Sequence, residues 1–229
     1  MDFSVIRDNL TYFLIGRYPS GPLGGLALTL WLAVVSLVLS FFGGLILGLC
    51  SVSRRPVLRV VSLTFINLVR GLPLLMVIFW TYFLWPALMG RPTAESQTVI
   101  ISLTVFTSAV MSQIVRAGIK AVPRGQTEAA VATGLSPRLA LLTVVLPQAL
   151  RSMIPSFVNQ FVSMIKDTSL AFIVGVDELT HVATQVNNRT LVFPTEIFTF
   201  VALVYFGICY AFTSLSRRLE RRFSWRKSI

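Results

Sequence analysis

The sequence predicts an all-α integral membrane protein, and three observations lead to this fold class. Hydrophobic residues make up 55% of the 229 residues and charged residues only 13%, whereas soluble domains carry about 25% charged residues. Several apolar runs are long enough to cross about 30 Å of hydrocarbon as a helix. The net charge of +11 comes from basic residues that flank these runs, which is typical of membrane topology and does not point to nucleic acid.

Residues 1–22 are mixed in character, with frequent aromatic residues and few charges. They start too polar for a cleavable signal peptide, and we expect an extracytoplasmic segment that lies along the membrane interface. The first span is expected from Leu23 to about Val52. Small residues recur in this span at a spacing of four, which places them on one helix face and predicts close helix packing; they are Ser36, Ser40, Gly44 and Gly48.

The second segment, 57–88, follows a basic turn at Arg54 and Arg55 and is interrupted by polar residues, Gly71 and Pro73. Two interpretations remain open. Either one long kinked helix crosses here, or an amphipathic piece precedes a span that starts at Leu72. Pro73 removes a helix hydrogen bond in both cases. Aromatic residues gather towards the far end of the segment, as expected at a membrane interface; they are Trp80, Tyr82 and Trp85.

The third span is expected over 98–119. The fourth crossing begins with a helix at Pro137 and continues through Pro147 and Pro155 to about residue 176. The stretch 177–195 is polar and is expected to be a loop, in which His181 is an ordinary exposed side chain. The fifth span is expected over 197–215, and a basic tail over 217–229.

Five crossings place the two termini on opposite sides of the membrane. By alternation, three basic segments share one side, namely the turn at 54–59, the loop at 120–151 and the tail. The positive-inside rule therefore predicts an outside N-terminus and a cytoplasmic C-terminus. We expect the transmembrane domain to occupy 23–216.

The cytoplasmic loop 122–150 carries its own helix signals. Pro123 and Gly125 break the preceding helix, and we expect Gly125 to cap a new helix over 126–133, with Glu128 near its positive end. Gly134 fits the position just past the end of that helix. Ser136 then caps a second helix, with Pro137 in its first turn.

A helix of about two turns is not stable in isolation. This one needs a groove, and Ala129, Ala130 and Ala132 allow another backbone to approach closely. The capping pattern alone leaves two interpretations open: a well-capped loop helix of a membrane protein, or a helix presented to a cytoplasmic partner.

Several kinds of catalytic or metal site are excluded by their missing motifs. The chain has one histidine, so a zinc site with two histidines is absent. No Lys follows Gly, so the phosphate-binding loop GxxxxGK[ST] is absent, and there is no GxSxG motif. Cys50 and Cys209 lie in apolar stretches and are interpreted as small core residues. We therefore expect no enzymatic activity and no bound cofactor in this chain.

Polar groups at membrane depth are costly and are default candidates for a substrate path. The fourth crossing is the best candidate for lining that path, because broken helices often do so. Alternatives remain open: Arg70 and Arg116 can snorkel to the interface, Lys166 and Asp167 can form an ion pair, and Asn159 can join helices. The candidates are Asn67, Arg70, Gln113, Arg116, Asn159, Lys166, Asp167, Thr168 and Ser169.

Four stretches together resemble the polar amino acid permeases of ABC importers, the histidine, glutamine and glutamate group. They are NLVRGLPLL (67–75), RAGIKAVPRGQTEAAVATG (116–134), LPQALR (146–151) and KDTSL (166–170). The similarity covers about 22–220. It implies a type I ABC importer transmembrane domain of five helices with a cytoplasmic coupling helix in the loop 122–150. The coupling residues that it implies are Gly125, Gln126, Glu128, Ala129, Ala130, Gly134 and Pro147.

The resemblance also implies partners and a location. It implies a second permease chain, identical or paired as a heterodimer, a dimer of ATPase subunits that bind ATP and Mg, and an extracytoplasmic amino-acid-binding protein. It implies the inner membrane of a bacterium. The likeness to glutamate/aspartate permease subunits suggests that substrate. One departure is Ser112-Gln113, where many relatives carry Ala-Glu.

Two other functions compete with an ATP-driven permease subunit. An ion-gradient-driven secondary amino acid transporter is suggested by Lys166 and Asp167, but no inverted repeat is evident in the sequence. A membrane scaffold without a transport path would not require the polar residues of the fourth crossing.

Overall fold

The structure is a computed structural model and describes residues 3–224. These residues form helices and no strand, which confirms the predicted fold class. The helices are α1 (Ser4–Asp8), α2 (Leu10–Ile15), α3 (Gly25–Ser51), α4 (Pro56–Arg70), α5 (Leu74–Met89), α6 (Glu95–Ala121), α7 (Arg124–Ala132), α8 (Pro137–Ala140), a π-helical turn (Leu141–Val145), α9 (Leu146–Asp167), a 3-10 helix (Thr168–Val174), α10 (Leu179–Thr190) and α11 (Pro194–Ser224).

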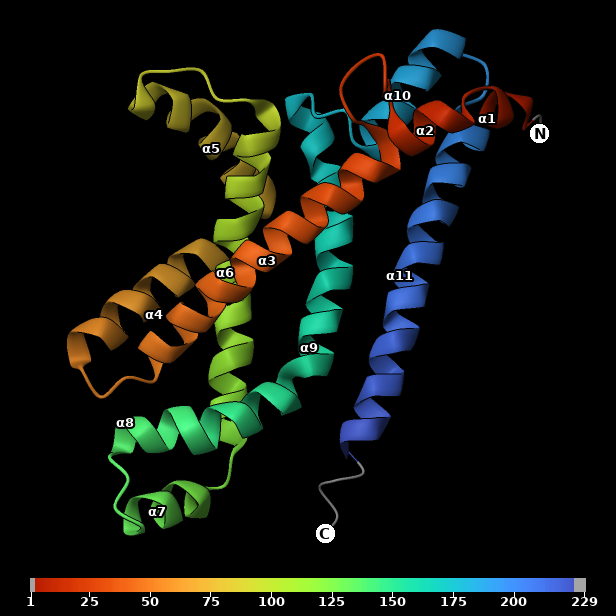
Figure 1. Cartoon of the computed structure of the whole chain (residues 1–229). Helices are drawn as coiled ribbons and strands as arrows, with labels where there is room; N and C mark the ends of the chain where they lie inside the picture. Colours follow the sequence, from red (N-terminus) through yellow and green to blue (C-terminus); the bar gives the residue numbers. More distant parts are fainter. Residues whose placement is uncertain (1–2, 225–229) are drawn as a thin grey trace.

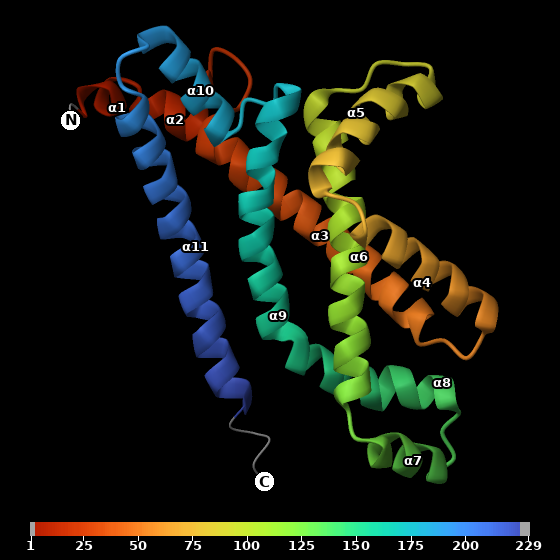
Figure 2. The same ribbon diagram turned by 180° about the vertical axis from the view of Figure 1, so that it is seen from behind.

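Within the described residues, four helical segments are long and apolar enough to cross a membrane: Gly25–Ser51, Glu95–Ala121, Pro137–Val174 and Pro194–Arg218. The bent pair of α4 and α5 is apolar and long enough only when taken together, and it makes a fifth crossing if the two helices form one broken span. Figures 1 and 2 show α3, α6, α9 and α11 running between the two ends of the molecule, with the N-terminal helices at one end and the C-terminus at the other.

The second segment is not one long kinked helix. α4 and α5 meet at an angle of 101° across the break between Arg70 and Leu74. Pro73 explains the break, because its ring removes a donor and drives the preceding residue towards extended backbone. α4 has one buried face and one exposed face. Ser62 and Ile66 are buried, while several of its other apolar side chains are exposed. The break into two helices agrees with the interpretation of an amphipathic piece before a second segment, although α5 begins at Leu74 and not at Leu72.

The face of small residues on α3 packs against α6, as the sequence predicts. A Cβ atom built on Gly44 would lie 2.5 Å from the Cβ of Met111, and one on Gly48 would lie 2.6 Å from the Cβ of Val115. Ser40 Oγ donates a hydrogen bond across the interface to the Thr104 carbonyl, at 3.3 Å. The two helix backbones therefore approach closely because no side chain stands between them.

The largest hydrophobic core cluster lies between these two helices and the fourth crossing. It includes Leu32, Ile78, Leu103, Met164 and Ile165, all fully buried. A second cluster joins α1, α2, α10 and α11 at the end of the molecule that holds the N-terminus.

The stretch 177–195 is not a simple loop, because it contains α10. Glu178 caps this helix and accepts hydrogen bonds from the backbone N–H groups of Thr180 (2.9 Å) and His181 (2.8 Å). The apolar residues follow helical spacing, and all are buried; they are Leu179, Val182, Ala183 and Val186. His181 is partly buried and contacts Asp177 Oδ1 through Nε2 at 3.5 Å, so the expectation of an exposed side chain was wrong.

Glu178 also joins three helices at this end of the molecule. Tyr205 of α11 donates to its carboxylate at 3.0 Å, and the adjacent Leu179 N–H donates to Thr29 Oγ1 of α3 at 3.1 Å. The side chain is fully buried. Burial raises the pKa of Glu178 from 4.5 to about 7, against the opposing effect of the hydrogen bonds that it accepts.

α11 is longer than the fifth span expected over 197–215. It begins at Pro194 and continues to Ser224, so the first part of the expected basic tail continues the helix. The rest of that tail, 225–229, lies outside the described residues.

The contact between α3 and α6 predicts the effect of adding a methyl group. We expect Gly44→Ala to lower the free energy of unfolding by about 1–3 kcal/mol, because the new Cβ overlaps Met111 and the helices must separate. Unfolding of the detergent-solubilised chain, followed by circular dichroism, measures this. Gly207→Ala on α11 is the matched control, because nothing lies within 4 Å of its Cβ position. Equal stability of the two variants would contradict the packing argument.

The buried carboxyl of Glu178 predicts a pH dependence of stability. Its pKa in the folded chain, about 7, is above the ordinary 4.5, so the folded state binds the proton more tightly. Stability from this group is complete below about pH 4.5 and is lost as the pH rises through about 7. The full difference corresponds to roughly 3 kcal/mol. Thermal unfolding measured across this range tests it; Glu178→Gln should remove that part of the pH dependence, and an unchanged profile would refute the assignment.

Candidate functional site

The end of α7 is held by a complete Schellman motif. Gly134 adopts φ +92° and its N–H bonds to the Val131 carbonyl at 2.9 Å, while the Leu135 N–H bonds to the Ala130 carbonyl at 3.2 Å. This is the pair of bonds expected when a residue with positive φ follows a helix. The predicted role of Gly134 is therefore confirmed, and the position requires a residue that tolerates positive φ.

The start of α7 differs from the sequence prediction. The helix begins at Arg124, with Pro123 as the capping residue, and Gly125 lies inside the first turn. Pro123 has extended backbone (ψ 136°), and the Gln126 N–H bonds to its carbonyl at 3.0 Å. Proline needs no N–H partner at a helix start, so the chain turns into α7 two residues earlier than a cap at Gly125 would place it.

The second helix of the loop starts as predicted. Ser136 Oγ accepts from the Leu139 N–H at 3.4 Å, and Pro137 occupies the first helical position. A π-helical turn over Leu141–Val145 follows and leads into α9. The widened turn precedes Pro147, which has no N–H to donate to the carbonyl four residues earlier.

α7 is attached through one side only. Ala130 is buried (7% exposed), and Gln126 Oε1 accepts from Gln148 Nε2 of α9 at 3.4 Å. Figures 1 and 2 show α7 beyond α8, at the end of the molecule opposite α1 and α10. The other side of α7 presents small or short side chains to the surroundings. We call this the exposed face of α7, and it consists of Glu128, Ala129, Val131 and Ala132.

A continuous helical segment begins just after α7 and leads into the fourth crossing. This segment, from Pro137 to Val174, is unbroken by loops, and Figure 1 shows it curving from α8 into α9. α7 is joined to it by the turn 133–136 and by contacts with α8 and the π-helical turn. The arrangement suits transmission of movement from one end of the molecule to the middle.

The polar break in the fourth crossing uses its hydroxyl groups locally. Thr168 is fully buried and donates to the Ile165 carbonyl at 2.7 Å, and Ser169 donates to the Lys166 carbonyl at 2.6 Å. Among residues 3–218, the ion pairs within 4 Å are Arg7–Asp8 and Asp177–His181. The Lys166–Asp167 ion pair is therefore not formed, and Lys166 is exposed.

The remaining substrate-path candidates do not come together within the chain. Asn67 and Arg70 are exposed at the end of α4, Gln113 is partly buried on α6, and Asn159 is exposed on α9. No hydrogen bond among the described residues joins any two of the candidate side chains. Likewise, in residues 3–224 no three His, Cys, Asp or Glu side chains are grouped as a metal site.

Arg116 lies in a different place, a hollow of about 790 Å³ near α7. We call this the basic groove. It lies among the end of α3, the start of α4, the end of α6 and the loop 122–150. Its basic side chains are Arg54, Arg55, Arg59, Arg116, Lys120, Arg124 and Arg138. The sequence places the basic turn and the basic loop on the same side of the membrane, but their meeting in one groove depends on the tertiary structure.

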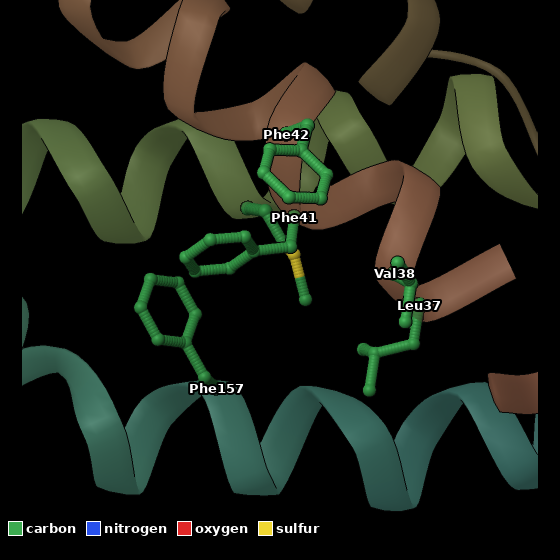
Figure 3. A pocket seen from close by; sticks show the side chains of 6 residues that line it. Leu37, Val38, Phe41, Phe42 and Phe157 are labelled. Carbon is green, nitrogen blue, oxygen red and sulfur yellow. The ribbon is translucent and has the colours of Figure 1, made fainter. Parts of the chain in front are cut away.

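A second hollow, of about 310 Å³, lies among α3, α6 and α9 and is apolar. Figure 3 shows the rings of Phe41 and Phe157 next to one another in its lining, edge to face with centroids 5.4 Å apart. The side chains of this lining offer no hydrogen-bonding group. The transfer of a polar molecule from water into the hollow would therefore cost several kcal/mol of free energy. This hollow is therefore not the site of a polar substrate. It is lined by Leu37, Val38, Phe41, Phe42, Met111 and Phe157.

Comparison with known proteins gives consistent matches along the chain. Residues 40–225 match the family described as binding-protein-dependent transport system inner membrane component. The probable glutamine ABC transporter permease protein GlnP of Bacillus subtilis is 42% identical over 202 residues, which is 86% of this chain and 91% of that protein. The glutamate/aspartate import permease protein GltK of Escherichia coli O6:H1 is 29% identical, with 96% of this chain and 97% of that protein covered.

The fold agrees with these sequence matches. It superposes on the crystal structure of an amino acid ABC transporter with histidines with a TM-score of 0.85 and 27% identity, over 97% of this chain and 99% of that one. The family match covers most of the chain, and the fold carries the helix and the helical path described above. The chain therefore belongs to the inner membrane components of binding-protein-dependent transport systems, as a type I ABC importer permease.

Proposed function

We propose that this chain is the permease subunit of an importer that carries a polar amino acid across a bacterial inner membrane by alternating access. A separate ATPase dimer supplies the energy, and α7 docks on it from the cytoplasm. The observation that carries the proposal is α7 itself. It is fixed at its C-terminal end by the Schellman motif, attached through Ala130, and open on its exposed face.

The mechanism follows from the rigid connection between α7 and the fourth crossing. When the ATPase subunits close on ATP, each cleft displaces the α7 that lies in it. The helical segment Pro137–Val174 passes this movement to the bundle, which rotates as a rigid body. The cavity between two permease chains then opens outward to accept the amino acid from an extracytoplasmic binding protein, and hydrolysis resets it.

The scattered polar candidates fit a path shared between two permease chains. Asn159 and Lys166 are exposed on α9, and Arg70 is exposed on α4. Exposed polar groups on membrane helices are costly unless a partner or a water-filled path covers them. A second permease chain, identical or different, supplies that cover in the proposal. The orientation with the N-terminus outside and the C-terminus in the cytoplasm is part of the same proposal and rests on the positive-inside rule.

Two substrate classes are favoured by different observations. The likeness of LVRGLPLLMVIFWTYF (68–83) and RAGI (116–119) to glutamate/aspartate permease subunits favours glutamate or aspartate, and a permease named for these substrates is 29% identical. The relative named for glutamine is 42% identical. These substrates share the α-amino and α-carboxyl groups and differ in the charge of the side chain. A secondary transporter driven by an ion gradient is not favoured by the family match.

The docking proposal predicts that changes in α7 abolish transport and leave membrane insertion intact. Glu128→Lys reverses a charge on the exposed face. Gly134→Asp forces a side chain into φ +92°, at a cost of about 1 kcal/mol. We expect both variants to reach the membrane at normal levels and to lose substrate uptake in cells.

Matched controls for these variants lie at other helix ends. Gly90 follows α5 with φ +64° and has open space around it, like Gly134. Gly90→Asp therefore imposes the same backbone strain without touching α7. Glu95→Lys imposes the same charge reversal at the start of α6. Full uptake by the Glu128 and Gly134 variants, or equal loss in the controls, would defeat the docking proposal.

The substrate is tested by reconstituted uptake with the cognate binding protein and ATPase. With radiolabelled glutamate, aspartate and glutamine offered in turn, the proposal expects ATP-dependent uptake of at least one of them. Uptake that continues without the ATPase but collapses with an ionophore would instead identify the secondary transporter.

A further inference from the structure

The basic groove gathers positive charge that the chain itself does not neutralise. Seven Arg and Lys side chains line the groove, and its lining includes no Asp or Glu. The ion pairs of the described residues lie elsewhere, at Arg7–Asp8 and Asp177–His181. Like charges that converge on one hollow repel each other. The arrangement therefore favours an anionic occupant from outside the chain.

The groove lies where two membrane spans end. Its lining includes Ser51 at the last turn of α3, and Arg116 and Lys120 in the last turns of α6. In a membrane, the ends of spans lie at the level of the lipid headgroups. The volume of about 790 Å³ is within the range of about 300–1,000 Å³ that is typical of small-molecule sites.

α4 presents two different faces here. Arg55 and Arg59 line the groove. Val57 and Val61 lie about 160° around the helix from Arg59 and are 71% and 63% exposed, so this apolar face points away from the groove. The contacts that the groove itself offers are therefore those of its basic side chains.

We propose that the basic groove binds the headgroup phosphate of an anionic phospholipid. Arginine presents a planar fork of donors that matches phosphate oxygens, and basic pockets beside membrane helices on the cytoplasmic side bind such headgroups. The assignment of the groove to the cytoplasmic leaflet rests on the proposed orientation of the chain.

The bound lipid would connect the turn between α3 and α4 to the loop that holds α7. Arg54 and Arg59 come from the turn and α4, whereas Arg124 comes from the first turn of α7 and Arg138 from α8. One phosphate contacted from both sides would fix α7 relative to the spans. Anionic lipid would therefore support ATPase-driven uptake in addition to binding.

The test measures lipid retention and transport in the assembled transporter. We reconstitute the permease with its ATPase and binding protein in phosphatidylcholine, with or without phosphatidylglycerol, and count retained lipid by native mass spectrometry. The expected result is selective retention of phosphatidylglycerol and faster uptake in its presence. The variant R54Q/R59Q should reduce phosphatidylglycerol retention by roughly tenfold or more, because each lost positive charge weakens the binding of anionic lipid by about fivefold.

Two further variants make the test specific. R17Q/R91Q removes two exposed arginines outside the groove and should retain phosphatidylglycerol as the unmodified chain does. R54K/R59K keeps the charge and loses the guanidinium forks, and should give intermediate retention. Circular dichroism of each variant confirms folding. Equal retention by R54Q/R59Q and R17Q/R91Q would overturn the proposal.

Other occupants give different outcomes. Displacement of retained lipid by inorganic phosphate would show a site for a free anion. Retention by the isolated permease that is lost in the complex would show that carboxylates of the ATPase fill the groove. Either result overturns the lipid assignment. A complex that retains phosphatidylglycerol through the groove but transports no amino acid would instead contradict the proposed function.

Discussion

The close contact of α3 with α6 is the constraint on which the rest of the structure depends. Gly44 and Gly48 leave no room for a Cβ atom against Met111 and Val115, so the two backbones form one rigid unit. α6 runs directly into Val122 and Pro123, and α7 starts one residue later. The packed pair of spans therefore sets where the chain enters α7, while the contacts of α7 itself lie with α8, the π-helical turn and α9.

The coupling proposal depends on α7 being held rigidly by its neighbours. α7 is too short to be stable in isolation, and its stability comes from the Schellman motif, the buried Ala130 and the Gln126–Gln148 hydrogen bond. A helix held in this way moves with its attachments. The unbroken helical segment that begins at Pro137 means that the attachments are themselves parts of a membrane span.

Features encoded by nearby residues were predictable from the sequence. The small residues of α3, the positive φ at Gly134 and the capping by Ser136 each depend on a few residues and on backbone geometry. Two local predictions were wrong. Gly125 was assigned as the cap, although Pro123 satisfies the start of α7 with extended backbone. The residues of α10 are predicted to form a loop because many of them are polar. These polar residues hide the helical spacing of the apolar ones and the acidic cap at Glu178.

Features that depend on tertiary arrangement were not predictable. The 101° bend between α4 and α5 is allowed by Pro73, but its size is set by packing against other spans. Arg116 was a candidate for the substrate path on sequence grounds, and its position beside Arg54 and Arg124 follows from how distant segments meet. The substrate-path candidates remain a prediction, because in the proposal a second chain completes the path.

The most direct test of the central claim is a crosslink between α7 and the ATPase subunit in the assembled transporter. Ala129→Cys places a small reactive group on the exposed face of α7, in a chain whose Cys50 and Cys209 are replaced by serine. With a maleimide that carries a benzophenone, which couples to the thiol and on irradiation inserts into a C–H bond of a neighbouring chain, the account predicts a product that joins this chain to the ATPase, and no such product from Arg91→Cys in the loop between α5 and α6. A product from Arg91→Cys, or reaction at Ala129→Cys only with the extracytoplasmic binding protein, would contradict the account.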